Sequence, residues 1–175
     1  MIKARLRAVE PADVDFIMEC ESDPMSSRWT DYRAPLSREQ LLTYALTYDA
    51  DPFRAGQLRL VAETAGERED YRPAGIVDLY EISEKDSRAY TGICIHPDLR
   101  RNGLGLGSLE ALALYNASRL GLDRLIAKIS TENLPALRLY EKAGYRKVAM
   151  LPSWHRIGSR FHDFHLLIQK NPSEV

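Results

Sequence analysis

The chain has 175 residues, 45% of them hydrophobic, which is enough for one domain (residues 1–175) with a core of its own. Its net charge of −1 offers no overall field for nucleic acid or an anionic membrane, and no apolar run approaches the roughly 20 residues that span a bilayer. The two cysteines, Cys20 and Cys94, provide neither a disulfide framework nor zinc spacing, and the N-terminus lacks a signal peptide's apolar stretch. These properties predict a soluble cytoplasmic protein that binds neither nucleic acid nor membrane.

The first half of the chain predicts a strand, two helices and three further strands. A strand around Leu6 precedes a helix that begins at residues 10–13, and residues 22–37 have the prolines and serines of a loop with short helical turns. Residues 37–40 resemble a capping box that opens the second helix. Apolar runs then predict strands over 58–63, 75–82 and 89–95, with a hairpin loop at 64–73.

The second half predicts two helices between strands. A helix over about 104–120 is closed by Gly121, and another over about 135–143 has Gly144 just past its end. Strands are predicted over 124–130, 145–150 and 164–168. The order predicts a mixed α/β domain with no internal repeat or linker.

A glycine-rich segment joins the strand that ends at Ile95 to the helix that begins at Leu104. Its charged and flexible residues are Arg100, Arg101, Gly103, Gly105 and Gly107. Glycines let the backbone approach a ligand, the N–H groups at a helix start attract phosphate oxygens, and arginines add positive charge. The segment therefore predicts an anion site.

Three interpretations of this segment compete. A dinucleotide fingerprint requires G-x-G-x-x-G, whereas the segment has G-x-G-x-G, and Asp123, at the expected distance of about 20 residues, precedes its strand rather than ending it. A P-loop is excluded because no Lys-Ser/Thr pair follows the glycines. The other two interpretations are glycines that serve only close helix–sheet packing and a pyrophosphate cradle.

Two segments resemble the signatures of the GNAT N-acetyltransferase superfamily. Residues 100–105 match its R/Q-x-x-G-x-G/A motif, and residues 131–145 resemble its E-N-x-x-A-x-x-L-Y-x-x-x-G-F/Y motif. Segments near the N-terminus and residues 158–163 resemble the branch of spermidine acetyltransferases and ribosomal-protein N-terminal acetyltransferases. The resemblance implies the GNAT fold, an α/β (α+β) fold with a mixed, mostly antiparallel central sheet flanked by helices. It also implies an acetyl-CoA-dependent N-acetyltransferase acting by direct transfer in a ternary complex.

The resemblance implies a set of residues around acetyl-CoA. The amides of residues 101–106 and the arginine side chains are expected to bind its phosphates. A backbone N–H within residues 93–95, on a strand that splays from its neighbour, is expected to donate a hydrogen bond to the oxyanion. Cys94 invites a covalent mechanism, but no His or acid partner lies near it in the sequence, so we expect a buried structural cysteine. The implied acetyl-CoA residues are Ile93, Cys94, Ile95, Arg100, Arg101, Asn102, Gly103, Leu104, Gly105, Asn133, Ala136 and Tyr140.

Tyr140 matches the position of the family's general acid. A phenol of pKa about 10 can hydrogen-bond and protonate a thiolate whose pKa is about 8.5, although a tyrosine on an amphipathic helix has the same pattern. Asp78 and Glu81 are the candidate bases, and their spacing places them on opposite faces of a regular strand, so that one faces the cleft. A solvated strand face is the alternative for either carboxylate.

The acceptor side is the least specified part of the site. Trp29, Asp31 and Tyr32 lie in a segment that resembles the family's variable substrate-facing region, although packing aromatics of a surface loop have the same composition. Tyr90 stands where the spermidine branch has a glutamate, a departure that counts against a polyamine. The acceptor is expected to be a primary amine: a small molecule, a polyamine or a protein N-terminus.

Three further expectations concern partners and alternatives. His155, His162 and His165 lack ligand spacing, so no metal site is expected, and residues 156–162 are assigned to a surface hairpin. By analogy with the family, a homodimer is a candidate assembly. A non-catalytic acyl-CoA-binding sensor or interaction module is the alternative function, against which the intact Tyr140 counts.

Overall fold

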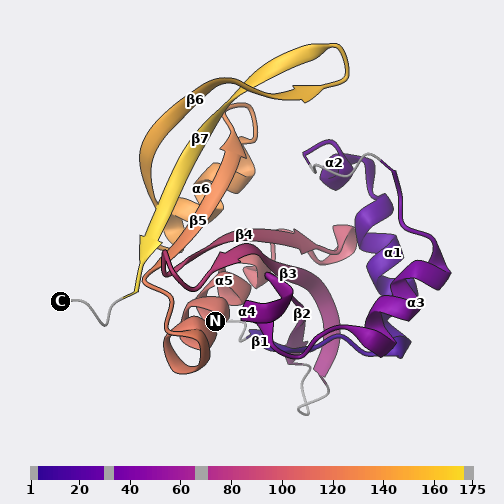
Figure 1. Cartoon of the computed structure of the whole chain (residues 1–175). Helices are drawn as coiled ribbons and strands as arrows, with labels where there is room; N and C mark the ends of the chain where they lie inside the picture. Colours follow the sequence, from indigo (N-terminus) through magenta and orange to yellow (C-terminus); the bar gives the residue numbers. More distant parts are fainter. Residues whose placement is uncertain (1–3, 30–33, 66–70, 172–175) are drawn as a thin grey trace.

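The computed structural model describes residues 4–29, 34–65 and 71–171 (Figure 1). Its strands are β1 (Ala4–Ala8), β2 (Gln57–Ala65), β3 (Tyr71–Ser83), β4 (Arg88–Ile95), β5 (Arg124–Ser130), β6 (Arg146–Ile157) and β7 (Arg160–Lys170). Its α-helices are α1 (Val14–Ser22), α2 (Pro24–Ser27), α3 (Arg38–Thr47), α4 (Pro52–Ala55), α5 (Leu104–Tyr115) and α6 (Leu134–Lys142). In the described part of the chain, no helix is both long and apolar enough to cross a membrane.

The strands form one seven-stranded sheet in the order β1-β2-β3-β4-β5-β7-β6. Every neighbouring pair is antiparallel except β4 and β5, which run parallel. The long connection between these two strands contains α5, as a parallel crossover requires. This arrangement confirms the mixed, mostly antiparallel sheet.

Alternating side chains of the sheet supply two separate cores. Val61 and Ile76 point to the face that α1 and α3 cover, together with Val14, Ile17 and Leu41. The opposite face packs against α5 and α6; its fully buried members include Val77, Leu79, Leu109, Leu112, Leu125 and Leu167. Because alternate side chains of β3 point to opposite faces, both faces of the sheet are apolar and each is covered by helices.

Most predicted elements are present with nearly the expected bounds. The strand over 124–130 coincides with β5, and Ser37 and Gln40 form the capping box of α3. The helix predicted to residue 120 is α-helical only to Tyr115 and continues as one π-helical turn before Gly121, whose φ is +67°. The short helix α4 was not predicted.

The hairpin of β6 and β7 extends well beyond its predicted strands. β6 continues to Ile157 through Pro152, and β7 begins at Arg160. Figure 1 shows this yellow hairpin rising above the rest of the molecule. Because β6 is an edge strand, it tolerates a proline that a central strand would exclude.

Candidate acetyl-donor and acceptor cleft

Strands β4 and β5 separate shortly after they meet. They share three register pairs, the last between Tyr90 and Ile126, although β4 continues to Ile95 and β5 to Ser130. On its other side, β4 stays paired with β3 to its end. The second half of β4 therefore has backbone groups that no strand of the described chain pairs, and a free N–H there can stabilise an oxyanion.

The glycine-rich segment opens helix α5 beside this splay. Gly103 is the N-cap, with φ +79°, and its carbonyl accepts the first helical hydrogen bond, from the Gly107 N–H at 3.0 Å. The amides of residues 104–106 precede that bond, so they are available to an anion at the positive end of a 12-residue helix.

The glycines also serve packing. A Cβ at Gly105 would lie 3.1 Å from a methyl group of Leu139 on α6, so the missing side chain lets the two helices approach. The packing interpretation thus fits Gly105, and the cradle interpretation stays a prediction. Leu104 points its side chain into the core and contributes to the cradle only through its backbone, and Asn102 is exposed outside the cleft lining.

The two arginines of the segment have different surroundings. The Nε of Arg100 donates to the Ile95 carbonyl at 3.0 Å, and its Nη2 donates to Asp23 at 2.6 Å. Arg101 has φ +65°, is exposed at the cleft, and makes no hydrogen bond or ion pair with any described residue. Arg101 is therefore the arginine whose side chain is available to phosphate. Protein groups already hold the Arg100 side chain, so its hydrogen bonds count against a phosphate contact, which stays a prediction.

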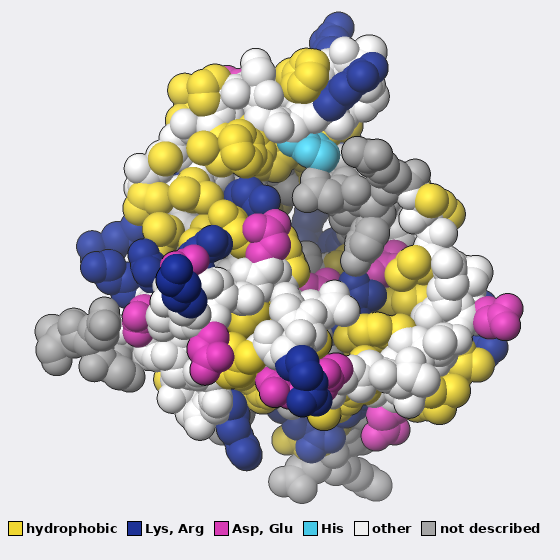
Figure 2. Space-filling view, viewed as in Figure 1, with side chains coloured by type: hydrophobic (Ala, Val, Ile, Leu, Met, Phe, Trp, Pro, Cys, Tyr) yellow, Lys and Arg dark blue, Asp and Glu magenta, His cyan; other side chains and the backbone are white. Residues whose placement is uncertain are grey.

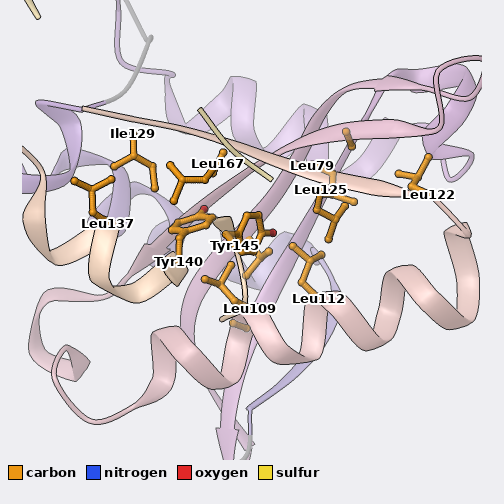
Figure 3. Close-up of a cluster of buried hydrophobic side chains, with 14 residues drawn as sticks. Leu79, Leu109, Leu112, Leu122, Leu125, Ile129, Leu137, Tyr140, Tyr145 and Leu167 are labelled. Atoms are coloured by element: carbon orange, nitrogen blue, oxygen red, sulfur yellow. The ribbon is translucent and has the colours of Figure 1, made fainter. Parts of the chain in front are cut away.

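Tyr140 is aimed at the point where the two strands separate. Its ring is 3% exposed, and its hydroxyl donates to the carbonyl of Thr91, at 3.4 Å, one residue beyond the last β4–β5 pair. Burial raises the pKa of Tyr140 to about 12, although the interaction with the Thr91 side chain acts in the opposite direction. Figure 3 shows its ring beside Tyr145, at 4.8 Å between centroids. The phenol is therefore held protonated at neutral pH.

Asn133 lies at the start of α6 and faces the same space. Its Oδ1 accepts the Ala136 N–H at 3.3 Å, so the residue caps the helix as expected. Both residues also line the cleft. The cap fixes the orientation of the Asn133 side-chain amide beside β4, the strand expected to contact the acetyl donor.

A cleft of about 1310 Å³ contains both halves of the expected site. It is visible in Figure 2 as a hollow with charged side chains in its wall. Of the predicted residues, those that line it are Trp29, Asp78, Ile93, Cys94, Ile95, Arg100, Arg101, Gly103, Gly105, Asn133, Ala136 and Tyr140.

The carboxylates of the cleft surround a buried arginine. Arg59 on β2 donates to Asp78 at 2.8 and 3.1 Å and to Glu21 at 2.7 Å, and its side chain is 11% exposed. Register pairs Arg59 directly with Asp78 across β2 and β3. Asp78 thus faces the acceptor side as a carboxylate that a guanidinium already holds.

Glu81 and Tyr90 do not line the cleft: of the two candidate bases only Asp78 faces it, as expected, and the predicted cleft position of Tyr90 is corrected. β3 has a register shift beyond Tyr80, where Glu81 takes φ +48°, and the Glu81 side chain is 62% exposed. Tyr90 stacks on Tyr80 and lies under the ammonium of Lys128, at 4.5 Å. Tyr80 and Lys128 line the cleft in its place. Asp31 and Tyr32 lie outside the described residues.

Sequence reasoning missed several residues that line the acceptor half. Two had a usable signal, because Arg59 and Lys128 are charges with apolar residues directly on both sides in their strands. The others come together only through the fold: Glu21, Tyr44, Tyr80, Trp154 and His155.

Cys94 is half-buried in the cleft wall rather than fully buried in the core. Its Sγ lies 3.4 Å from the Cys20 carbonyl oxygen and 3.4 Å from the Ser26 hydroxyl. The Cys20 thiol, followed by Ser26 and the charge of Arg100, lowers the pKa of Cys94 against the effect of burial. The thiol is thus held by neighbours on α1 and α2.

Comparison with known proteins agrees with this geometry. The acetyltransferase (GNAT) domain family matches residues 3–146. An uncharacterized N-acetyltransferase of Bacillus subtilis (strain 168) is 28% identical over 152 residues, 83% of this chain and 81% of that protein. The spermidine N(1)-acetyltransferase of Escherichia coli (strain K12) is 26% identical over 141 residues, 81% of this chain and 72% of that protein.

The fold resembles that of solved acetyltransferases. The spermidine N-acetyltransferase of Vibrio cholerae, in complex with CoA and spermine, superposes with a TM-score of 0.83 at 23% identity, covering 97% of this chain and 96% of that one. The family match, the split strands and the helix N-terminus beside them lead to one conclusion. The chain belongs to the GNAT acetyltransferase family and is an acetyl-CoA-dependent N-acetyltransferase.

Proposed function

We propose that the protein transfers an acetyl group directly from acetyl-CoA to a primary amine held in the same cleft. The observation that carries this proposal is the continuity of the cleft. One cavity is lined by the unpaired edge of β4, the start of α5 and Tyr140 on one side, and by Trp29 and Asp78 on the other. Both reactants can therefore be held in contact, which direct transfer requires.

The chain's groups match the demands of attack on a thioester. Acetyl-CoA supplies the activated acetyl group, and the amides of residues 104–106 with Arg101 would hold its phosphates. As the amine nitrogen bonds to the carbonyl carbon, negative charge develops on the carbonyl oxygen. A backbone N–H of residues 93–95 is the proposed donor to that oxygen. The C–S bond then breaks, and the sulfur leaves with the electron pair.

We assign Tyr140 the role of hydrogen-bond donor to the departing sulfur. Its pKa of about 12 keeps the proton on the phenol throughout the neutral range. Full proton transfer to a thiolate of ordinary pKa, about 8.5, would be uphill by about 5 kcal/mol. Tyr140 therefore stabilises the thiolate chiefly by donating a hydrogen bond. In the overall reaction the amine nitrogen loses one proton, and the CoA thiolate gains one from solvent.

Asp78 is the proposed carboxylate that attracts the ammonium form of the acceptor and, as a base, receives its proton for transfer to water. Arg59 already donates to both oxygens of Asp78. Glu21 is held by the same guanidinium. The described carboxylates of the cleft are thus partly neutralised, which favours an acceptor with a single amine, such as a small monoamine or a peptide N-terminus, over a polyamine.

The test is acetyl transfer to a panel of amines, followed through release of free CoA thiol. The panel contains spermidine, an aromatic monoamine and a short peptide with a free N-terminus. Tyr140→Phe is expected to lower kcat by about 10²-fold or more on the best acceptor, since the sulfur loses its donor.

Tyr145→Phe is the matched control. The Tyr145 hydroxyl is buried without a hydrogen-bond partner in the described structure, and its ring touches that of Tyr140. Its removal should leave turnover unchanged. Full turnover in Tyr140→Phe would refute the assigned role, and acetyl-CoA binding without turnover on any amine would instead support an acyl-CoA-binding module.

We further propose that the enzyme acts in the cytoplasm as a homodimer. Its two cysteines are free thiols, the form that a reducing compartment maintains. The edge strand β6 has exposed apolar side chains, including Val148, Met150 and Trp154. A spermidine N-acetyltransferase of Vibrio cholerae with the same fold is dodecameric, which supports self-association of this chain.

A further inference from the structure

Arg100 bridges two parts of the cleft that come from distant parts of the sequence. Its Nε donates to the carbonyl of Ile95, the last residue of β4, at 3.0 Å. Its Nη2 donates to Asp23 Oδ2 at 2.6 Å and to Ser26 Oγ at 2.8 Å. The Arg100 and Asp23 side chains are 27% and 13% exposed, so solvent screens this ion pair only partly.

Asp23 and Ser26 build the first turn of α2. Asp23 is the N-cap of this helix, and its Oδ2 accepts both the Ser26 N–H at 3.0 Å and the Ser26 hydroxyl at 2.9 Å. Trp29 lies two residues beyond the helix and lines the cleft. A single guanidinium thus connects the end of the donor strand to the segment that presents Trp29.

We propose that Arg100 is a positioning residue for the acceptor: it fixes α2, and Trp29 with it, against the end of β4. This inference rests on the proposed acetyl transfer to an amine. Arg100 acts through Asp23 and Ser26 rather than on a reactant. The neighbouring Arg101, which no described residue engages, serves the donor phosphates instead.

Cys94 extends the same connection along β4. Its Sγ lies 3.4 Å from Ser26 Oγ, so the hydroxyl that Arg100 holds also contacts the donor strand. The α2 turn therefore touches β4 at Cys94 and, through Arg100, at Ile95. Contacts at two adjacent residues of β4 define the orientation of the α2 turn better than a single contact would.

Steady-state kinetics can separate the roles of the two arginines. Asp23→Asn removes the carboxylate charge but keeps a good N-cap residue. Arg100→Gln removes the guanidinium and its paired N–H donors. Each should raise the amine KM about tenfold, the cost of one charge-assisted hydrogen bond. The dissociation constant of acetyl-CoA should stay within about twofold, since residues 101–106 are untouched. Arg101→Gln, the matched variant, should show the reverse pattern.

The double variant Asp23→Asn/Arg100→Gln tests whether the pair acts as one unit. If each residue works through the other, the double variant is no worse than either single variant. Independent roles would instead multiply the two losses. Arg100→Lys keeps the positive charge but loses the paired guanidinium donors, so its amine KM should lie between those of the wild type and Arg100→Gln.

A second measurement does not depend on turnover. The chain has two tryptophans, so Trp154→Phe leaves Trp29 as the only indole reporter. In that background, Asp23→Asn and Arg100→Gln should increase acrylamide quenching of Trp29 fluorescence, whereas Arg101→Gln should leave it unchanged.

The two readouts distinguish the failure of each proposal. Altered quenching in a protein that acetylates no amine would overturn the proposed function and leave the Arg100 connection standing. A raised acetyl-CoA dissociation constant in Arg100→Gln, with unchanged amine KM and unchanged quenching, would overturn the positioning role.

Discussion

Arg7 shows at the scale of one residue how buried charge is organised away from the cleft. Its guanidinium holds Asp13 by two hydrogen bonds, at 2.6 and 2.8 Å, and Glu63 by one, at 2.7 Å. Both carboxylates are only 4% exposed. Burial acts to raise the pKa of each, but the hydrogen bonds from Arg7 outweigh it together with the Glu10 N–H at Asp13 and Arg5 at Glu63, and both pKa values end below their usual range.

Arg7→Met should destabilise the protein by about 3 kcal/mol at pH 7, because it leaves the buried Asp13 without a guanidinium and Glu63 with Arg5 alone. Urea unfolding at pH 7 measures this loss. In the wild type, the stabilisation is present at neutral pH and disappears as pH falls below about 4, since both folded pKa values are lowered. In the variant, burial acts with less compensation, so the deficit should shrink between pH 7 and pH 5.

Arg38→Met is the matched control for this prediction. Arg38 pairs with Asp15 at 2.8 Å, but both side chains are more than half exposed. Its loss should leave the urea midpoint nearly unchanged. An equal loss in both variants, at every pH, would contradict the buried-charge explanation.

At the scale of an element, β4 depends on the close approach of β3. A Cβ at Gly75 would lie 2.5 Å from the Cys94 carbonyl oxygen, a backbone atom that cannot rotate away. Gly92, on β4 itself, has room: its Cβ would lie 3.7 Å from Asp78 and 3.9 Å from Tyr80. The geometry of the donor strand is thus determined partly by an absent side chain on its neighbour.

Gly75→Ala should cost about 1–3 kcal/mol of unfolding free energy and weaken acetyl-CoA binding, because β4 must shift. Gly92→Ala should show no steric loss of stability. Chemical unfolding and calorimetric titration with acetyl-CoA test the pair. Equal behaviour of the two variants would contradict the steric explanation.

The elements also show what sequence patterns can predict. The capping box at Ser37 and the bounds of β5 followed from local chemistry, since both depend on neighbouring residues. The length of β6 did not, because Pro152 ordinarily ends a strand and only the edge position permits it. In the cleft, Tyr140 was found through its motif, whereas the ion pair of Arg59 with Asp78 depends on the register of two strands, which brings together residues 19 apart in the sequence.

At the scale of the whole molecule, the edge strand β6 and its hairpin partner β7 leave apolar side chains exposed to solvent. Val148 and Met150 are 54% and 57% exposed, and Phe161 on β7 is 64% exposed. Unpaired edge strands with apolar side chains readily pair with another chain, and a symmetric pairing of two copies closes on itself. The same hairpin contributes Trp154 and His155 to the cleft, so association would occur near the acceptor side.

The double substitution Val148→Lys/Met150→Lys should convert a dimer to a monomer, as measured by sedimentation velocity, with an unchanged far-UV circular dichroism spectrum. Leu114→Lys is the control, since Leu114 is 72% exposed on α5, away from this hairpin. A wild-type protein that sediments as a monomer at all concentrations would rule out the dimer.

The early separation of β4 from β5 has a consequence for the life of the protein. The free enzyme has an incomplete sheet in its interior, and acetyl-CoA bound in that gap, as proposed, would stabilise the folded state. A ligand present at 100 times its dissociation constant adds about 2.7 kcal/mol to the unfolding free energy. The resistance of this protein to heat and to proteolysis should therefore rise and fall with the supply of acetyl-CoA, so that its abundance reflects the metabolic state of the cell.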